Sequence, residues 1–118
     1  MKKDVLTILV VDDEAPLREM YSMFIAGLGH VVATAASGDI AFGMCKTYDY
    51  DAVLADLNMF GINGIELSRL LAEKDGRRPT FILMSTDEVS PEKAGEHVDH
   101  ILRKPFSRAV LGEKLQEL

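Results

Sequence analysis

The stretch Asp-Ala-Val-Leu-Ala-Asp-Leu-Asn-Met-Phe-Gly-Ile-Asn-Gly at residues 51–64 organises the chain. Its apolar run Ala52–Ala55 is typical of a strand that is buried on both faces of a parallel sheet. The run stops at Asp56, and turn-forming residues follow before a helical pattern extends from Ile65 to Glu73. The stretch therefore predicts a carboxylate at the carboxyl end of a buried strand, where open α/β sheets bind ligands. Taken alone, Asp56 is explained equally well as a residue that caps a turn.

The same alternation of strand and helix patterns extends to both sides of this stretch. The other predicted strands are Leu6–Val11, Val31–Thr34, Thr80–Met84 and Asp99–Arg103, and the other predicted helices begin near Pro16, Ser37, Pro91 and Ser107. The apolar stripe of the first helix is Leu17, Met20, Tyr21, Phe24 and Leu28, and that of the second is Ala41, Met44, Cys45 and Tyr48. Gly95 is expected to end the fourth helix early. Short repeated βα units predict an α/β, doubly wound five-stranded parallel sheet with a shortened fourth helix.

Length and composition limit the class of protein. The 118 residues suit one domain, and the net charge of −6 argues against direct nucleic-acid binding. No apolar run approaches the roughly 20 residues that span a bilayer. The single cysteine, Cys45, is interpreted as a small core residue, and a reducing, cytoplasmic location is expected. The helical pattern at Leu118 is compatible with a natural chain that stops there or continues into another domain.

Polar residues follow four of the predicted strands, at the edge where all carboxyl ends meet. They are Asp12 and Asp13 after the first strand, Asp56 after the third, Ser85 and Thr86 after the fourth, and Lys104 after the fifth. Gathered carboxylates repel each other unless a cation lies among them, and oxygen donors without histidine or cysteine favour Mg²⁺. Asp56 at the centre is a candidate nucleophile for phosphorus, with Lys104 and the Ser85 hydroxyl as partners of the phosphoryl oxygens.

Each of these motifs also has an ordinary explanation. The acidic cluster at residues 12–14 is favourable at a helix start, Lys104-Pro105 is a common surface turn, and Ser85-Thr86 is a normal strand end. The three histidines have no metal-type spacing and are interpreted as surface or loop residues. The acids, the hydroxyl and the lysine occur together at successive strand ends, and this combination indicates a magnesium-dependent phosphoryl site.

With these residues identified, essentially the whole chain resembles the receiver domain of two-component response regulators. The resemblance is carried by Val-Val-Asp-Asp-Glu at 10–14, Asp56 followed eight residues later by Gly64, the Ser85-Thr86 strand end, and Lys104-Pro105-Phe106. It implies the (βα)5, flavodoxin-like form of the doubly wound fold, as one receiver domain over residues 1–118.

The resemblance also implies how the site binds metal and phosphate. Asp56 would accept a phosphoryl group from a phosphohistidine on a sensor histidine kinase or a histidine phosphotransfer protein. Mg²⁺ would be bound by the side chains of Asp13 and Asp56 and by the backbone carbonyl of Asn58, with Asp12 acting through a water. The chemistry would be limited to magnesium-dependent self-phosphorylation and slow self-dephosphorylation, so the chain is not expected to be an enzyme with a separate substrate.

The remaining matched residues would act on the bound phosphoryl group. Lys104 would pair with it, next to a cis Lys104–Pro105 bond. Ser85 would be the hydroxyl switch, and Thr86 is the less favoured candidate because the apolar run ends directly at Ser85. Phosphorylation would then shift a two-state equilibrium and signal to a partner protein or an attached C-terminal output domain, and a homodimer is also compatible with this reading.

Four departures from the family pattern affect the expected output. Phe60 replaces the usual proline after the phosphoacceptor, which either loosens that loop or packs a ring there. Thr86 replaces a small residue and is expected to narrow access to Asp56, and Ile101 replaces the usual aromatic switch residue. The segment between Ser85 and Lys104 is short, with His97-Val98 in place of Gly-Ala. Phosphorylation is expected to survive these changes, and the output is expected to differ.

Two other classes of protein share part of this pattern. A phosphohydrolase with an aspartyl nucleophile needs an acid two residues later, and Asn58 at that position cannot supply a proton. A receiver-like module that binds partners without phosphorylation is favoured by Ile101 and the short fourth unit, and opposed by the complete acidic cluster.

Overall fold

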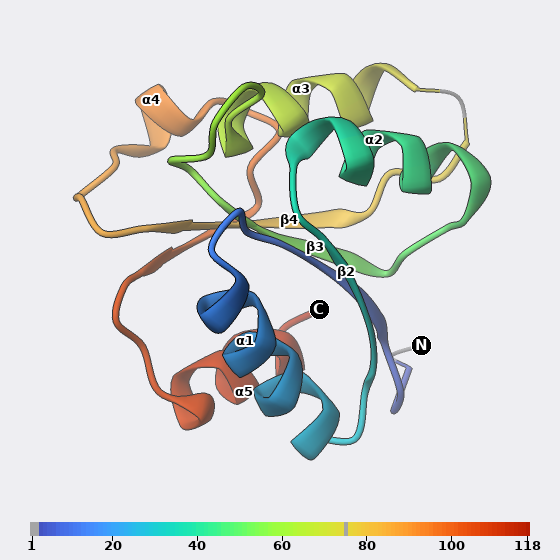
Figure 1. Ribbon diagram of the computed structural model, residues 1–118, viewed down its shortest axis with the longest axis vertical. Coiled ribbons are helices and arrows are strands. Elements are labelled where there is room, and N and C mark those ends of the chain that lie inside the picture. Colours follow the sequence, from blue (N-terminus) through green and yellow to red (C-terminus); the bar gives the residue numbers. More distant parts are fainter. Residues whose placement is uncertain (1–2, 75) are drawn as a thin grey trace.

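The computed structural model describes residues 3–74 and 76–118. Within them, five strands alternate with five helices along the chain (Figure 1). The elements are β1 (Thr7–Val11), α1 (Ala15–Gly27), β2 (Val31–Ala35), α2 (Gly38–Thr47), β3 (Ala52–Asp56), α3 (Gly64–Glu73), β4 (Thr80–Ser85), α4 (Pro91–Ala94), β5 (His100–Arg103) and α5 (Arg108–Gln116).

All strand pairs are parallel, and the strand order in the sheet is β2-β1-β3-β4-β5. Helices α1 and α5 cover one face, while α2, α3 and α4 cover the other (Figure 1). The α/β, doubly wound five-stranded parallel fold with a shortened fourth helix is therefore confirmed. Helix α4 has four residues and ends at Gly95, whose φ of 91° is a conformation that glycine adopts at little cost.

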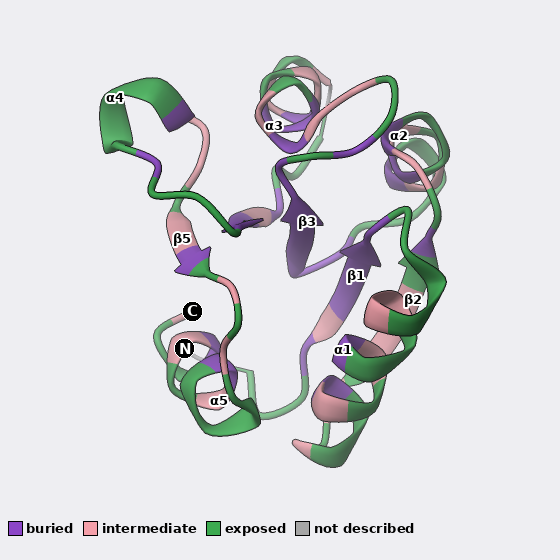
Figure 2. Cartoon of the chain, turned by 60° about the vertical axis from the view of Figure 1, so that its left-hand side comes forward, coloured by how far each residue is buried: buried purple, intermediate pink, exposed green. Residues whose placement is uncertain are grey.

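The central strand β3 is buried on both faces, as its unbroken apolar sequence predicts. Val53 and Ala55 point into the core under α2, α3 and α4, whereas Ala52 and Leu54 point into the core under α1 and α5. Figure 2 shows β3 buried along its length and β1 buried except at its first residue. Two apolar layers thus hold the middle of the sheet, and the carboxyl end of β3 is positioned by rigid packing on either side.

Helix starts agree well with the sequence. The hydroxyl of Ser37 accepts a hydrogen bond from the Ile40 N–H, and that of Ser107 accepts one from the Val110 N–H. Two predicted core residues are wrong: Met20 is exposed on α1, and Tyr48 is exposed in extended backbone just past the end of α2. Ile25 takes the buried place on α1. Cys45 is buried, as predicted, and burial raises the pKa of its thiol to about 11.

At the amino edge of the sheet, the buried carboxylate of Asp51 joins three segments. It accepts hydrogen bonds from the Thr7 N–H at 2.8 Å, from Lys3 Nζ at 2.9 Å and from Arg77 Nη2 at 2.9 Å. Burial alone would raise the pKa of Asp51, but the hydrogen bonds from Thr7, Lys3 and Arg77 outweigh it and lower that pKa. The carboxylate therefore stabilises the fold in its charged form.

Replacing Asp51 with Asn is expected to lower the free energy of unfolding at pH 7 by about 1–2 kcal/mol, because a charge-assisted acceptor is lost. A lowered folded-state pKa means that this contribution is present above the unfolded value of about 3.9 and is lost as the pH falls through the folded value. The difference between wild type and Asp51→Asn in urea unfolding should therefore shrink below about pH 4.

Asp49→Asn is the matched control, since Asp49 is exposed and lies only two residues away. Equal destabilisation by both variants, or a difference that persists unchanged at low pH, would contradict the role given to Asp51.

Candidate functional site

The carboxyl edge of the sheet brings together the last residue of β3 and the residues that follow β1 and β5. Val11 pairs with Ala55, so that Asp12 and Asp56 end up side by side. Lys104 follows Arg103, the last residue of β5. The strand order reverses between β1 and β3, which is where ligands bind in open α/β sheets.

Three carboxylates converge at this point. One oxygen from each of Asp12, Asp13 and Asp56 lies within 4.8 Å of the other two. Asp12 and Asp56 are buried, whereas Asp13 is exposed. Asp13 Oδ2 accepts a hydrogen bond from the Phe60 N–H at 3.1 Å, which ties the loop after β3 to the loop after β1.

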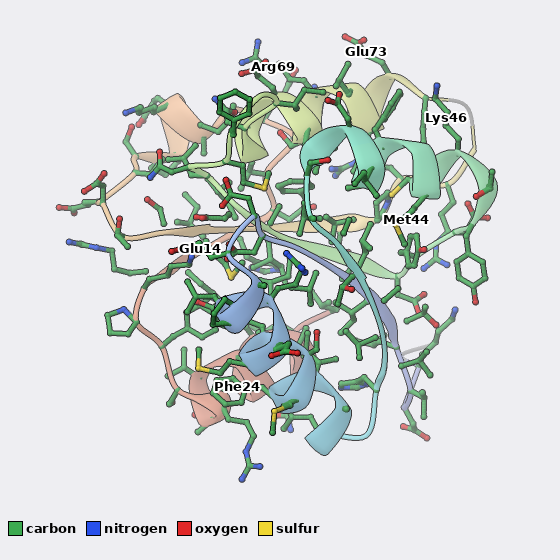
Figure 3. All side chains as sticks on the ribbon, viewed as in Figure 1. Glu14, Phe24, Met44, Lys46, Arg69 and Glu73 are labelled. Carbon is green, nitrogen blue, oxygen red and sulfur yellow. The ribbon has the colours of Figure 1, made fainter. Side chains whose placement is uncertain are left out.

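Asp12 is also fixed by its own loop. Its Oδ1 accepts a hydrogen bond from the Glu14 N–H at 2.9 Å, and its backbone carbonyl accepts one from Arg18 Nη1 at 2.8 Å. Glu14, labelled in Figure 3, lies at this end of the sheet, where β1 passes into α1. The Asp12 carboxylate is therefore held with one oxygen bonded to its own loop and the other directed towards Lys104.

The Lys104 ammonium lies between two of these acids and is only 7% exposed. Its Nζ is 3.3 Å from Asp12 Oδ2 and 3.4 Å from Asp56 Oδ1. Burial would lower the pKa of Lys104, but the neighbouring Asp56 and Asp12 carboxylates reverse that effect and raise it. The ammonium therefore stays charged at neutral pH.

The cluster has more negative than positive charge, with three carboxylates and one ammonium, and the pKa of Asp56 is raised. Burial raises the pKa of Asp56, and the nearby Asp12 carboxylate adds to this, while the Lys104 ammonium and the Asn58 N–H act in the opposite direction. One ammonium facing three carboxylates leaves an excess of negative charge that a cation would relieve. An all-oxygen donor set of this size fits Mg²⁺, which takes one or two protein carboxylates and keeps several waters.

The two predicted hydroxyl residues, Ser85 and Thr86, differ in burial. Ser85 is fully buried as the last residue of β4, and its Oγ accepts a hydrogen bond from the Asp87 N–H at 3.1 Å. Thr86 is exposed, and its backbone carbonyl accepts a hydrogen bond from Arg103 Nε at 2.8 Å. Asn58 is exposed and contributes its backbone N–H to the Asp56 carboxylate.

The family departures have clear positions in the fold. Phe60 is 93% exposed, so the replacement of proline leaves a ring in solvent and does not add a packed one. Ile101 is partly buried against the core under α2, α3 and α4. The Lys104–Pro105 bond is cis, as the resemblance implies.

Sequence reasoning missed one residue beside the site. Tyr21 was assigned only to the apolar stripe of α1, yet Lys104 Nζ lies over its ring, 5.6 Å from the centroid. A hydroxyl-bearing side chain within an otherwise apolar stripe was the available signal, because a buried tyrosine usually requires a polar partner.

Gly64 sets the position of the Asp56 backbone. A Cβ at Gly64 would lie 2.6 Å from Leu83 Cδ1 and 2.7 Å from the Asp56 carbonyl oxygen. The first turn of α3 therefore packs directly on the strand end that carries Asp56, and this close approach is available only to glycine.

Gly64→Ala should lower the free energy of unfolding by about 1–3 kcal/mol, because the added methyl group must displace Leu83 or the end of β3. Gly43→Ala is the control, since nothing lies within 4 Å of a Cβ there, and in an exposed helical position it should be stabilising by about 0.5–1 kcal/mol. Urea denaturation measures both; a neutral Gly64→Ala would mean that the close approach is not required.

Comparisons with known proteins agree with this geometry. The sequence profile of the response regulator receiver domain matches residues 8–116. The chain is 32% identical over 118 residues to chemotaxis protein CheY-3 of Vibrio cholerae, covering 96% of this chain and 91% of that protein. It is 35% identical over 102 residues to the transcriptional regulatory protein ResD of Bacillus subtilis, covering 85% of this chain.

Among solved structures, the chain is similar to response regulator TrrA of Thermotoga maritima in complex with Mg(2+)-BeF. The TM-score is 0.86 at 28% sequence identity, over 95% of this chain and 97% of that one. The chain belongs to the response regulator receiver domain family. It is thus a phosphoacceptor domain of two-component signalling.

The chain spans 42% of the length of ResD, and relatives include longer DNA-binding response regulators such as MtrA. Receiver domains interact with histidine kinases, which agrees with the partner class expected for this chain. In the part of the chain that the structure describes, no helix has the length and apolar character needed to cross a bilayer.

Proposed function

We propose that Asp56 is the phosphoacceptor and that the site works with Mg²⁺. The observation that supports this best is the Lys104 ammonium, which is buried between Asp12 and Asp56 at 3.3 and 3.4 Å. Mg²⁺ would be held by Asp13 and Asp56 with the backbone carbonyl of Asn58, and Asp12 would act through a water. When bound, Mg²⁺ neutralises charge on the transferring phosphoryl group and orients its oxygens.

The chain's own residues then perform three tasks. An oxygen of the Asp56 carboxylate attacks phosphorus, the P–N bond of the donor phosphohistidine breaks, and its electron pair returns to the imidazole nitrogen. Lys104 donates hydrogen bonds to a phosphoryl oxygen and offsets the charge that Asp56 gains. The rigid packing around β3 and Gly64 holds Asp56 for attack, since phosphoryl transfer depends chiefly on positioning and electrostatics.

Ser85 is the proposed switch residue. Its Oγ accepts the Asp87 N–H, so its own hydroxyl proton can still be donated to a phosphoryl oxygen on Asp56. Drawing Ser85 and Lys104 towards the phosphoryl group would move the loop that begins after β5 at Lys104 and, from its Ser85 end, the segment between β4 and β5. That segment would carry the signal to a partner protein or to an attached domain, in the cytoplasm, with a sensor histidine kinase or histidine phosphotransfer protein as donor.

Phosphorylation is tested directly by intact mass after incubation with Mg²⁺ and phosphoramidate. The wild type should gain one phosphoryl group, and Asp56→Asn should gain none because the attacking oxygen is replaced by an amide. Lys104→Ala should be phosphorylated at least about tenfold more slowly, since a charge-assisted partner of the phosphoryl group is lost. Omitting Mg²⁺ or adding EDTA should abolish the reaction.

Asp39→Asn serves as the control, since Asp39 is an exposed acid in the first turn of α2 that is not part of the cluster. A phosphoryl group that persists in Asp56→Asn would move the acceptor elsewhere, and an unmodified wild type would contradict the proposed function.

Thr86 is expected to control the lifetime of the acyl phosphate. Its β-branched side chain is exposed directly after β4, next to the strand that carries Asp56, and would obstruct the approach of water. Thr86→Ala should shorten the half-life of the phosphorylated form, measured by intact mass after removal of the donor. Thr86→Val keeps the bulk without the hydroxyl and should behave like the wild type. An unchanged or longer half-life in Thr86→Ala would refute the obstruction.

A further inference from the structure

Tyr21 connects α1 to both ends of the Lys104–Phe106 segment. Its side chain, on the face of α1 that packs on the sheet, is 3% exposed. The ring stacks on Phe106 with centroids 5.2 Å apart and an interplanar angle of 12°. The same ring has Lys104 Nζ over it at 5.6 Å. One buried side chain therefore contacts both Phe106 and the ammonium of Lys104.

The hydroxyl of Tyr21 is the polar part of this contact. Burial raises the pKa of Tyr21, and the Lys104 ammonium acts against it through its charge and a hydrogen bond. The phenol remains neutral at physiological pH, so it places a polar group beside the ammonium without adding a charge. An ammonium has three donor positions, and Asp12, Asp56 and Tyr21 together surround it.

This arrangement matters because a lysine is a point charge on a flexible four-carbon stem. Bound only to carboxylates, Lys104 would have to give up one of them whenever it turned towards a phosphoryl oxygen. A neutral acceptor can hold the ammonium while it exchanges a carboxylate for a phosphoryl oxygen. The stacking on Phe106 fixes the ring, so this acceptor does not move with the exchange.

We infer that Tyr21 is a positioning residue for Lys104, which sets how tightly the site binds the phosphoryl group of a donor. The inference rests on the proposed role of Lys104 at Asp56. It adds a residue of α1 to the phosphoryl site through a single side chain, whose ring centroid lies 5.6 Å from the ammonium and whose hydroxyl is its polar end. If Tyr21 had only a packing role, truncating it would lower the stability of the protein without a selective effect on the half-saturating donor concentration.

The kinetic test compares Tyr21→Phe, Tyr21→Leu and the control Phe24→Leu. Phe24 lies on the same helix and touches Tyr21 edge-on, with centroids 6.4 Å apart. Phosphorylation by phosphoramidate is followed by intact mass over a range of donor concentrations at saturating Mg²⁺. Tyr21→Phe keeps the stacked ring and should raise the half-saturating donor concentration about five- to tenfold, as expected for one hydrogen bond to a charged group. Phe24→Leu should leave it unchanged.

A second measurement is independent of phosphorylation. In a sample with ¹³C-labelled lysine, the Lys104 ε-CH₂ signal should carry a ring-current shift from Tyr21, assigned by its absence in Lys104→Arg. Tyr21→Leu should remove the shift, Tyr21→Phe should alter it because the ammonium is released, and Phe24→Leu should leave it in place. These spectra need no donor, so they report on Tyr21 even if Asp56 is not phosphorylated.

The outcomes separate the two ideas. The positioning role is overturned if Tyr21→Phe has the half-saturating donor concentration of the wild type. It is also overturned if the Lys104 chemical shift is unchanged in both Tyr21 variants. Equal losses in Tyr21→Phe and Phe24→Leu indicate packing alone and also overturn it. A wild type that shows the Lys104 shift but accepts no phosphoryl group contradicts the proposed function and leaves the Tyr21–Lys104 contact established.

Discussion

The structure depends on one electrostatic constraint: Asp12 and Asp56 are buried side by side and share the ammonium of Lys104. Buried charges are costly unless they are paired, and here the pairing is incomplete, because one cation serves an acidic cluster. The strand order makes this unavoidable, since it brings the ends of β1 and β3 together. The fold thus maintains a site that added positive charge would stabilise. Such a site suits a cation that binds together with a phosphoryl group.

The two edges of the sheet use acidic residues in opposite ways. At the amino edge, Asp51 is satisfied by Thr7, Lys3 and Arg77, and Asp99 accepts from the Phe81 N–H and Arg78. These carboxylates have protein donors and hold the segments before β1, β4 and β5. At the carboxyl edge, the acids share a cation and remain partly uncompensated. Stability is concentrated at one end and reactivity at the other, so the site can change charge without loosening the frame.

Much of this was predictable from the sequence, for identifiable reasons. Strand ends are marked by abrupt changes from apolar to charged residues, as at Asp12 and Asp56, and parallel topology brings such ends to one edge. Helix caps at Ser37 and Ser107 follow from local chemistry. Contacts between distant side chains were not predictable: nothing local to Tyr21 specifies Lys104. Periodicity also failed on α1, where Met20 is exposed and Ile25 is buried, because packing against the sheet decides which neighbours of the stripe are covered.

The brevity of α4 has a mechanical consequence. Its four residues form a single turn, closed by backbone bonds from Ala94 to Ser90 and from Gly95 to Pro91. A helix of one turn is too short to tilt as a rigid body. The segment between β4 and β5 is instead fixed at separate points, with the side chains of Val89 and Ala94 buried in the core under α2, α3 and α4. A partner that reads this side of the domain would therefore sense a local change in surface contour.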